Sequence, residues 1–147
     1  MADVSTLQLL LEQAERARDE ALVAMQQAQQ RAAHAHAQHK DLGEYQQQYD
    51  QRWFGQFREG AAVQILQAHQ QFGLRLTDAI GQQAGMAALL DARVEGARLQ
   101  LQEREIKVAT ARKLIERRQA EALVQQMRAE QKTSDEFAAQ RARLNLR

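Results

Sequence analysis

The chain has 147 residues with no Pro and no Cys, and only 5% of its side chains are aromatic. Ala and Gln together make up over a third of it, with 27 and 25 residues. Ala, Gln, Glu, Arg and Leu are good helix formers, and the strongest helix breaker is missing. Few bulky aromatic residues remain to fill a wide core. We therefore expect an all-α protein and exclude a sheet-based enzyme fold.

Charge and hydropathy exclude further classes. The formal net charge is +1, which indicates no general affinity for nucleic acid. The lack of Cys excludes a disulfide scaffold and cysteinyl zinc sites. No stretch approaches the roughly 20 apolar residues that span a bilayer, so no direct membrane insertion is expected. Residues 1–60 carry a net charge of −3 and residues 61–147 one of +4, which favours the two halves lying side by side.

A heptad pattern runs through the first third of the chain and predicts a helix over about 4–53. Its seven positions are all apolar: Leu7, Ala14, Ala21, Ala28, Ala35, Leu42 and Tyr49. The positions four residues on, from Leu11 to Trp53, are apolar in four of seven cases. Seven heptads without a slip are typical of a coiled coil, and the many Ala residues predict a close approach of two helices.

A second heptad pattern with a different phase predicts a helix over about 62–132. Nine of its ten positions are apolar: Leu66, Ile80, Ala87, Val94, Leu101, Val108, Ile115, Ala122 and Ala129, with Gly73 as the exception. Between the two patterns, Gly55 and Gly60 mark a predicted turn at 54–61. One continuous helix with a stutter, as in a long parallel dimer, is the alternative.

The end of the chain contains a helix-start signal. Thr133-Ser134-Asp135-Glu136 resembles an N-cap followed by an acidic first turn, so we expect the second helix to break there before a short basic tail over 133–147. The whole chain, 1–147, is then one antiparallel two-helix coiled-coil hairpin with a longer C-terminal arm. Residues beyond about 110 overhang the N-terminus, and their apolar register needs a partner.

At this point the sequence resembles the flagellar export protein FliJ family. The segment from Gln38 to Tyr49 is similar to the family pattern Leu-x-x-Tyr-x-x-x-Tyr, and Phe72–Gln83 and the ending Gln131-Lys132-x-x-Asp135-Glu136-Phe137-Ala138 are similar to two other family segments. The resemblance implies a cytoplasmic stalk protein, similar in fold to the central stalk of rotary ATPases and peripheral to the inner membrane at the flagellar base. It implies three partners: the export ATPase FliI with its regulator FliH, the cytoplasmic domain of the export gate FlhA, and substrate-specific export chaperones.

The resemblance also implies a gate-binding surface near the turn. The matching residues are Gln38, Leu42, Tyr45 and Tyr49 on the first helix, and Phe72, Leu76 and Ala79 on the second. Both sets step by four and three residues, so each lies along one helix face. Tyr45 is expected to face Phe72, and Gln38 to face Ala79. The alternative is that these are ordinary seam residues.

A basic stretch is the second candidate site. It comprises Arg104, Lys107, Arg112, Lys113, Arg117 and Arg118. It suits electrostatic docking on the ATPase ring, or it is a solvated helix face with local ion pairs such as Glu103–Lys107. Acidic residues interrupt it and no aromatic residues interleave, which argues against nucleic acid.

No catalytic, metal or cofactor site is predicted. His34, His36 and His39 do not converge on one point of a helix, and no glycine-rich phosphate loop is present. We expect a non-enzymatic protein that is a monomeric hairpin when free. The corresponding stalk of a virulence-type secretion system and a self-associating structural coiled coil are the alternatives.

Overall fold

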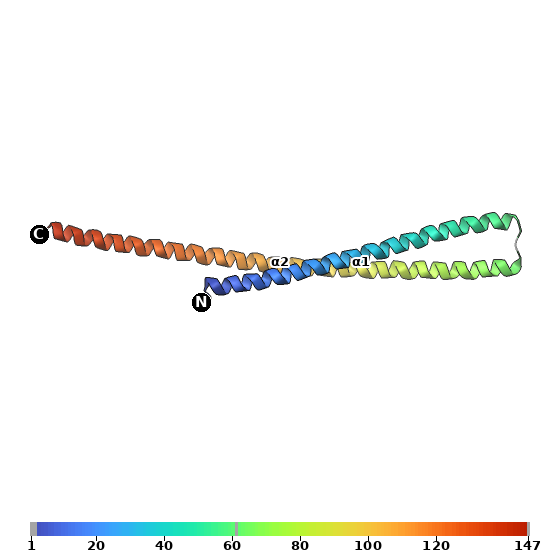
Figure 1. The fold of residues 1–147 in the computed structure, drawn as a ribbon, viewed down its shortest axis with the longest axis horizontal. Coiled ribbons are helices and arrows are strands. Elements are labelled where there is room, and N and C mark those ends of the chain that lie inside the picture. Colours follow the sequence, from blue (N-terminus) through green and yellow to red (C-terminus); the bar gives the residue numbers. More distant parts are fainter. Residues whose placement is uncertain (1–2, 61, 147) are drawn as a thin grey trace. The chain divides into compact units, whose positions relative to one another are not determined.

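The computed structural model describes residues 3–60 and 62–146, and their regular structure consists of two long helices. Helix α1 covers Val4–Arg58 and helix α2 covers Val63–Asn145 (Figure 1). The two helices pack against each other, which confirms the all-α hairpin, and α2 is the longer arm, with 83 residues against 55.

The turn is tighter than the sequence predicts. Helix α1 continues past Trp53 and through Gly55 to Arg58, so the turn is confined to the few residues before Val63. Gly60 has a φ of 87°, a left-handed conformation that only glycine adopts without strain, and its N–H donates to the carbonyl of Phe57 at 3.3 Å. One glycine in this conformation is sufficient to end the helix, which explains why Gly55 remains helical.

The start of α1 has a clear cap. The carboxylate of Asp3 accepts a hydrogen bond from the N–H of Val4 at 2.7 Å, and the Asp3 carbonyl accepts one from the N–H of Leu7. These acceptors satisfy N–H groups that the first turn of a helix leaves free.

The predicted break near residue 132 is absent from the structure. Helix α2 continues through Thr133–Glu136 to Asn145, so the tail predicted for 133–147 is helical as far as that residue. The Thr133 hydroxyl does not cap a new helix: it donates to the carbonyl of Ala129, four residues earlier, at 2.9 Å. The Gln131 amide donates to Asp135 at 3.0 Å, again within the helix. With no Pro or Gly in this segment, a cap-like sequence is accommodated in the helix interior.

The chain divides into two compact units, and each contains a stretch of both helices. One unit comprises Met1–Asp19 and Glu103–Arg147, and the other comprises Glu20–Gln102. In the second unit, α1 and α2 run antiparallel from the turn. The first unit brings the N-terminal part of α1 beside α2, where Glu15 accepts a hydrogen bond from Arg112 at 3.2 Å.

Both heptad registers are reflected in burial. Every position of the first register and its companion set, from Leu7 to Trp53, is buried or partly buried. The second register is buried or partly buried as far as Ile115, and its companions three residues on as far as Arg118. In the described part of the chain, eight apolar side chains are buried: Leu7, Ala32, Ala35, Leu76, Ala87, Leu101, Val108 and Ile115. The core is therefore a narrow seam, and Ala supplies three of its eight residues.

The last part of α2 has no such seam. Every described residue from 119 to 146 is exposed, including Ala122 and Ala129, which continue the second register. We call residues 119–146 the overhang. Its large apolar side chains lie off that register, and Phe137 is 67% exposed.

The outer surface carries local ion pairs. Glu95 and Arg98 are joined at 2.6 Å, and Glu103 and Lys107 at 3.6 Å. The hydrogen bond from Arg98 lowers the pKa of the Glu95 carboxyl below its ordinary value. Within the described residues, neither helix has a stretch apolar enough to cross a membrane.

Candidate partner-binding surface

Aromatic side chains gather where the two helices approach the turn. On α1, Tyr45, Tyr49, Trp53 and Phe57 follow one another at intervals of four residues, which places them along one slowly turning face of the helix. On α2, His69 and Phe72 are three residues apart and lie on one face as well. We call these six residues the aromatic cluster. All of them belong to the same compact unit.

The rings of the aromatic cluster are in direct contact. Tyr49 lies at its centre, with ring centroids 4.7 Å from Phe72 and 5.0 Å from His69. Tyr45 stacks on Tyr49 at 6.3 Å and meets Phe72 edge-on at 6.5 Å. Such offset and edge-to-face pairs contribute about 0.5–1.5 kcal/mol each beyond the area that they bury. The cluster therefore fixes the two helices side by side at this level.

His69 is the polar member of the cluster. Its ring lies 4.6 Å from Trp53 and meets Phe57 edge-on at 5.5 Å. Its Nδ1 atom is buried and has no hydrogen-bond partner. The imidazole thus packs here as a flat ring between aromatic neighbours.

The structure brings most of the predicted gate-binding residues to one level. Tyr45 faces Phe72 as the sequence predicts. Gln38, expected beside Ala79, accepts a hydrogen bond from the amide of Gln83, one helical turn further along α2, and this amide also donates to the carbonyl of Ala35, both at 3.1 Å.

The predicted surface has an exposed rim and a buried floor. Tyr45 is 49% exposed and Phe72 is 38% exposed, whereas Leu76 is only 7% exposed and belongs to the seam. Leu42, Tyr49 and Ala79 are partly buried between these extremes. A partner could therefore touch Tyr45 and Phe72 directly, while Tyr49 and Leu76 support them from below.

Three members of the aromatic cluster are missing from the sequence-based surface: Trp53, Phe57 and His69. The four-residue spacing that continues from Tyr45 and Tyr49 to Trp53 and Phe57 is a signal that could have identified two of them. His69 carries a different signal: it lies three residues after Leu66, at a companion position of the second heptad register. Its contacts with the rings of Tyr49 and Trp53 are visible only in the structure.

The basic stretch does not form one continuous cationic face. Arg104 and Arg118 are partly buried in the companion register of the seam. Lys107 pairs with Glu103, and Arg112 pairs with Glu15 of α1. Lys113 and Arg117 are exposed and line a shallow hollow together with Thr110 and Leu114. Lys113 and Arg117 are therefore the exposed members of the stretch that form no ion pair with another described residue.

The histidines of α1 are used in a different way. His36 bonds through Nε2 to both carboxylate oxygens of Asp91 on α2, at 2.8 and 2.9 Å. This contact joins the two helices across the seam. Among the described residues, no group of three or more His, Asp or Glu side chains is arranged to hold a metal ion.

The family model for the flagellar FliJ protein matches residues 3–147. No curated protein and no solved structure matches the chain. The family match covers both compact units, the aromatic cluster and the overhang.

Proposed function

Because the chain belongs to the flagellar FliJ family, a non-catalytic component of flagellar protein export, we propose that it is a stalk and adaptor between the export ATPase FliI and the export gate FlhA. The observation that carries the proposal is that one chain has two different surfaces available to partners. One is an aromatic cluster beside the turn, and the other is a single-helix overhang beyond the N-terminus of α1.

The gate-binding half of the proposal rests on the rim of the predicted surface. Tyr45 and Phe72 keep 49% and 38% of their surface accessible although they touch other rings. Exposed aromatic side chains held rigidly by a packed floor are typical binding hot spots, since little side-chain entropy is lost when a partner covers them. The surface would bind the cytoplasmic domain of FlhA.

The ATPase-binding half rests on the other unit. Lys113 and Arg117 are exposed just before the overhang, and the overhang leaves all of its side chains accessible. An uncovered amphipathic helix is a usual element for insertion into a groove or ring. The basic stretch and the overhang would engage FliI, with its regulator FliH nearby, and ATP hydrolysis would stay with FliI.

The remaining parts of the proposal concern place and stoichiometry. The protein would act in the cytoplasm at the flagellar base, peripheral to the inner membrane, and would meet the chaperones that carry export substrates. The paired length of α1 and α2 is complete within one chain, so the free protein would be a monomeric hairpin in dilute solution. Nucleotide-driven asymmetry in FliI would then be passed to the gate through the packed helices.

The gate surface is tested by binding of purified variants to the cytoplasmic domain of FlhA. Tyr45→Ala combined with Phe72→Ala should weaken binding by roughly tenfold or more, because it removes the two exposed rings of the rim. Phe54→Ala is the matched control, since Phe54 is an aromatic residue of α1 that is 64% exposed and lies outside the surface. Equal binding of both variants, with helicity unchanged by circular dichroism, would contradict the assignment.

The ATPase half is tested separately by co-purification with FliI. The full chain should co-purify, and Lys113→Glu combined with Arg117→Glu should reduce the recovered complex. Exchange of two exposed cations on the other unit, Arg75→Glu and Arg93→Glu, is the matched control. A loss that is equal in both double variants would indicate a general charge effect and not a docking site.

A further inference from the structure

Four of the six large apolar side chains of the overhang form a stripe that no other described residue covers, while Val124 and Leu146 lie outside it. Leu123, Met127, Phe137 and Leu144 are 58–71% exposed. At about 100° per residue they fall within a sector of about 100° on one side of the helix. The heptad step from Ile115 leads to Ala122, so the stripe begins one residue later than the seam register and has its own phase. At Leu144 the stripe reaches the edge of the seam register, because Leu144 follows Val108 by 36 residues, which is about ten full turns of the helix.

The charges of the overhang are distributed unequally around this face. Of its eight charged residues, only Glu130 and Arg141 share the sector of the apolar stripe. The other six point away from it by helical geometry: Glu121, Arg128, Lys132, Asp135, Glu136 and Arg143. Neither Glu130 nor Arg141 forms an ion pair within the described chain, and Glu130 only accepts a hydrogen bond from the Gln126 amide at 3.3 Å. The face thus presents one unpaired anion and one unpaired cation.

From this pattern we propose that two copies of the protein pair through their overhangs in antiparallel orientation. When Glu130 of one copy is placed opposite the partner's Arg141, Met127 falls opposite the partner's Leu144 and Ser134 opposite the partner's Phe137. A two-fold axis repeats each of these pairs, so two ion pairs, two Met127–Leu144 pairs and two Ser134–Phe137 contacts form together. Parallel pairing is disfavoured, because it would place Glu130 against Glu130 and Arg141 against Arg141.

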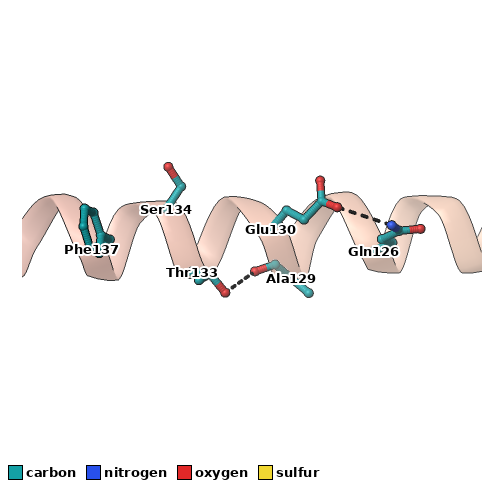
Figure 2. A pocket seen from close by; sticks show the side chains of 6 residues that line it. All are labelled: Gln126, Ala129, Glu130, Thr133, Ser134 and Phe137. Atoms are coloured by element: carbon teal, nitrogen blue, oxygen red, sulfur yellow. Dashed lines mark hydrogen bonds between the residues drawn. The ribbon is translucent and has the colours of Figure 1, made fainter.

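The shape of the face agrees with this register. Figure 2 shows Glu130, Ser134 and Phe137 following one another along the helix. They line a shallow hollow, together with Gln126, Ala129 and Thr133. In antiparallel packing the Phe137 ring of each copy would enter this hollow of the other copy, where the small Ser134 leaves room, as a knob enters a hole. The flanking positions are neutral, among them Gln126, Gln131, Thr133 and Gln140, so no flanking charge opposes the contact.

The overlap is short, and the association is accordingly weak. Residues 127–144 span about 27 Å of helix, which is fewer than three full heptads. The pairing adds to the monomeric hairpin and does not replace it, since α1 and α2 already cover each other's seams. It becomes visible as a dimer that grows with protein concentration.

Charge exchange tests the proposal with the full chain alone. In sedimentation velocity over a concentration series, the wild-type chain should form dimers. Glu130→Arg should weaken them by roughly tenfold, because each of the two ion pairs becomes a like-charge pair. The double exchange E130R/R141E should restore wild-type association. A mixture of Glu130→Arg and Arg141→Glu chains should form mixed dimers, although neither variant associates well by itself.

Glu136→Arg is the matched control, since it makes the same charge change on the opposite side of the overhang and should leave association unchanged. A wild-type chain that stays monomeric, or a Glu130→Arg chain that associates like wild type, would overturn the proposal. So would equal losses in Glu130→Arg and Glu136→Arg. These outcomes are independent of binding to FliI and FlhA, so they do not decide the stalk function.

Discussion

Helix α2 has two regions that follow the same heptad register with opposite results. At Ala87 the register position is only 3% exposed, whereas Ala122 and Ala129, one and two heptads after Ile115, are exposed. The difference is the presence of α1, which supplies a facing helix for the first region and none for the second. A heptad pattern therefore reports a face that can be buried, and the partner decides whether it is.

The comparison also separates two kinds of apolar surface. Beside the turn, the aromatic cluster buries bulky rings against each other and leaves only a rim for a partner. In the overhang, Met127 and Phe137 are more than half exposed and contact no facing helix. The first surface stabilises the hairpin and can bind as well, while the second does nothing for the hairpin and is available only for association.

The largest effect on stability is expected at the aromatic cluster. Trp53 contacts Tyr49 of its own helix and His69 of α2, with ring centroids 5.9 and 4.6 Å apart. Trp53→Ala should lower the free energy of unfolding by about 2–4 kcal/mol, toward the lower part of the range for Trp because the side chain is only partly buried. Urea unfolding followed by circular dichroism measures the change.

The control for this prediction is Phe54→Ala, one residue further on α1. Phe54 is 64% exposed, and the Arg58 guanidinium lies 5.0 Å from its ring centroid. Its loss should change stability by less than about 1 kcal/mol. If the two variants were equally stable, the cluster would not be what fixes α2 against α1 at this level.

Sequence reasoning predicts the hairpin well, because heptad phase and turn chemistry are local signals. The positions from Leu7 to Trp53 and from Leu66 to Ile115 are identified as seam residues by spacing alone, and the structure buries or partly buries them. The limits of the helices are less predictable. Gly55 and the Thr133–Glu136 segment have breaker or cap composition, yet both lie inside helices, because the neighbouring sequence is strongly helix-forming.

The candidate surface is only partly predictable for a different reason. The positions of Tyr45 and Phe72 follow from helical spacing and from which residues face across the seam. The heptad spacing from Leu66 places His69 at a companion position of the seam, but its packing among aromatic rings depends on a contact between residues of two helices.

An intermediate effect is expected from overpacking the Ala seam. Ala87→Leu places three further carbon atoms at a position that is 3% exposed, between closely approaching helices. It should destabilise the hairpin by about 1–3 kcal/mol. The same exchange at Ala122, in the same register but exposed, should change stability by no more than about 0.5 kcal/mol.

Thermal unfolding of both variants at low protein concentration decides between two readings of the overhang. A large decrease in melting temperature for Ala87→Leu and a small one for Ala122→Leu mean that the register positions are buried only beside α1. A comparable loss for Ala122→Leu would mean that residues around 122 are covered in the folded monomer.

The smallest effects concern helix propensity, and they have opposite signs in the two regions. A Cβ added at Gly85, within the paired region, meets no atom within 4 Å, so Gly85→Ala should stabilise the hairpin by about 0.5–1 kcal/mol.

Ala129→Gly makes the reverse change in the overhang, where no tertiary contact supports the helix. It should weaken the local helix by about 1 kcal/mol and leave the unfolding midpoint of the hairpin unchanged. Hydrogen exchange would show faster exchange only for amides around and beyond residue 129, whereas a lowered hairpin midpoint would mean that the overhang and the hairpin unfold as one unit.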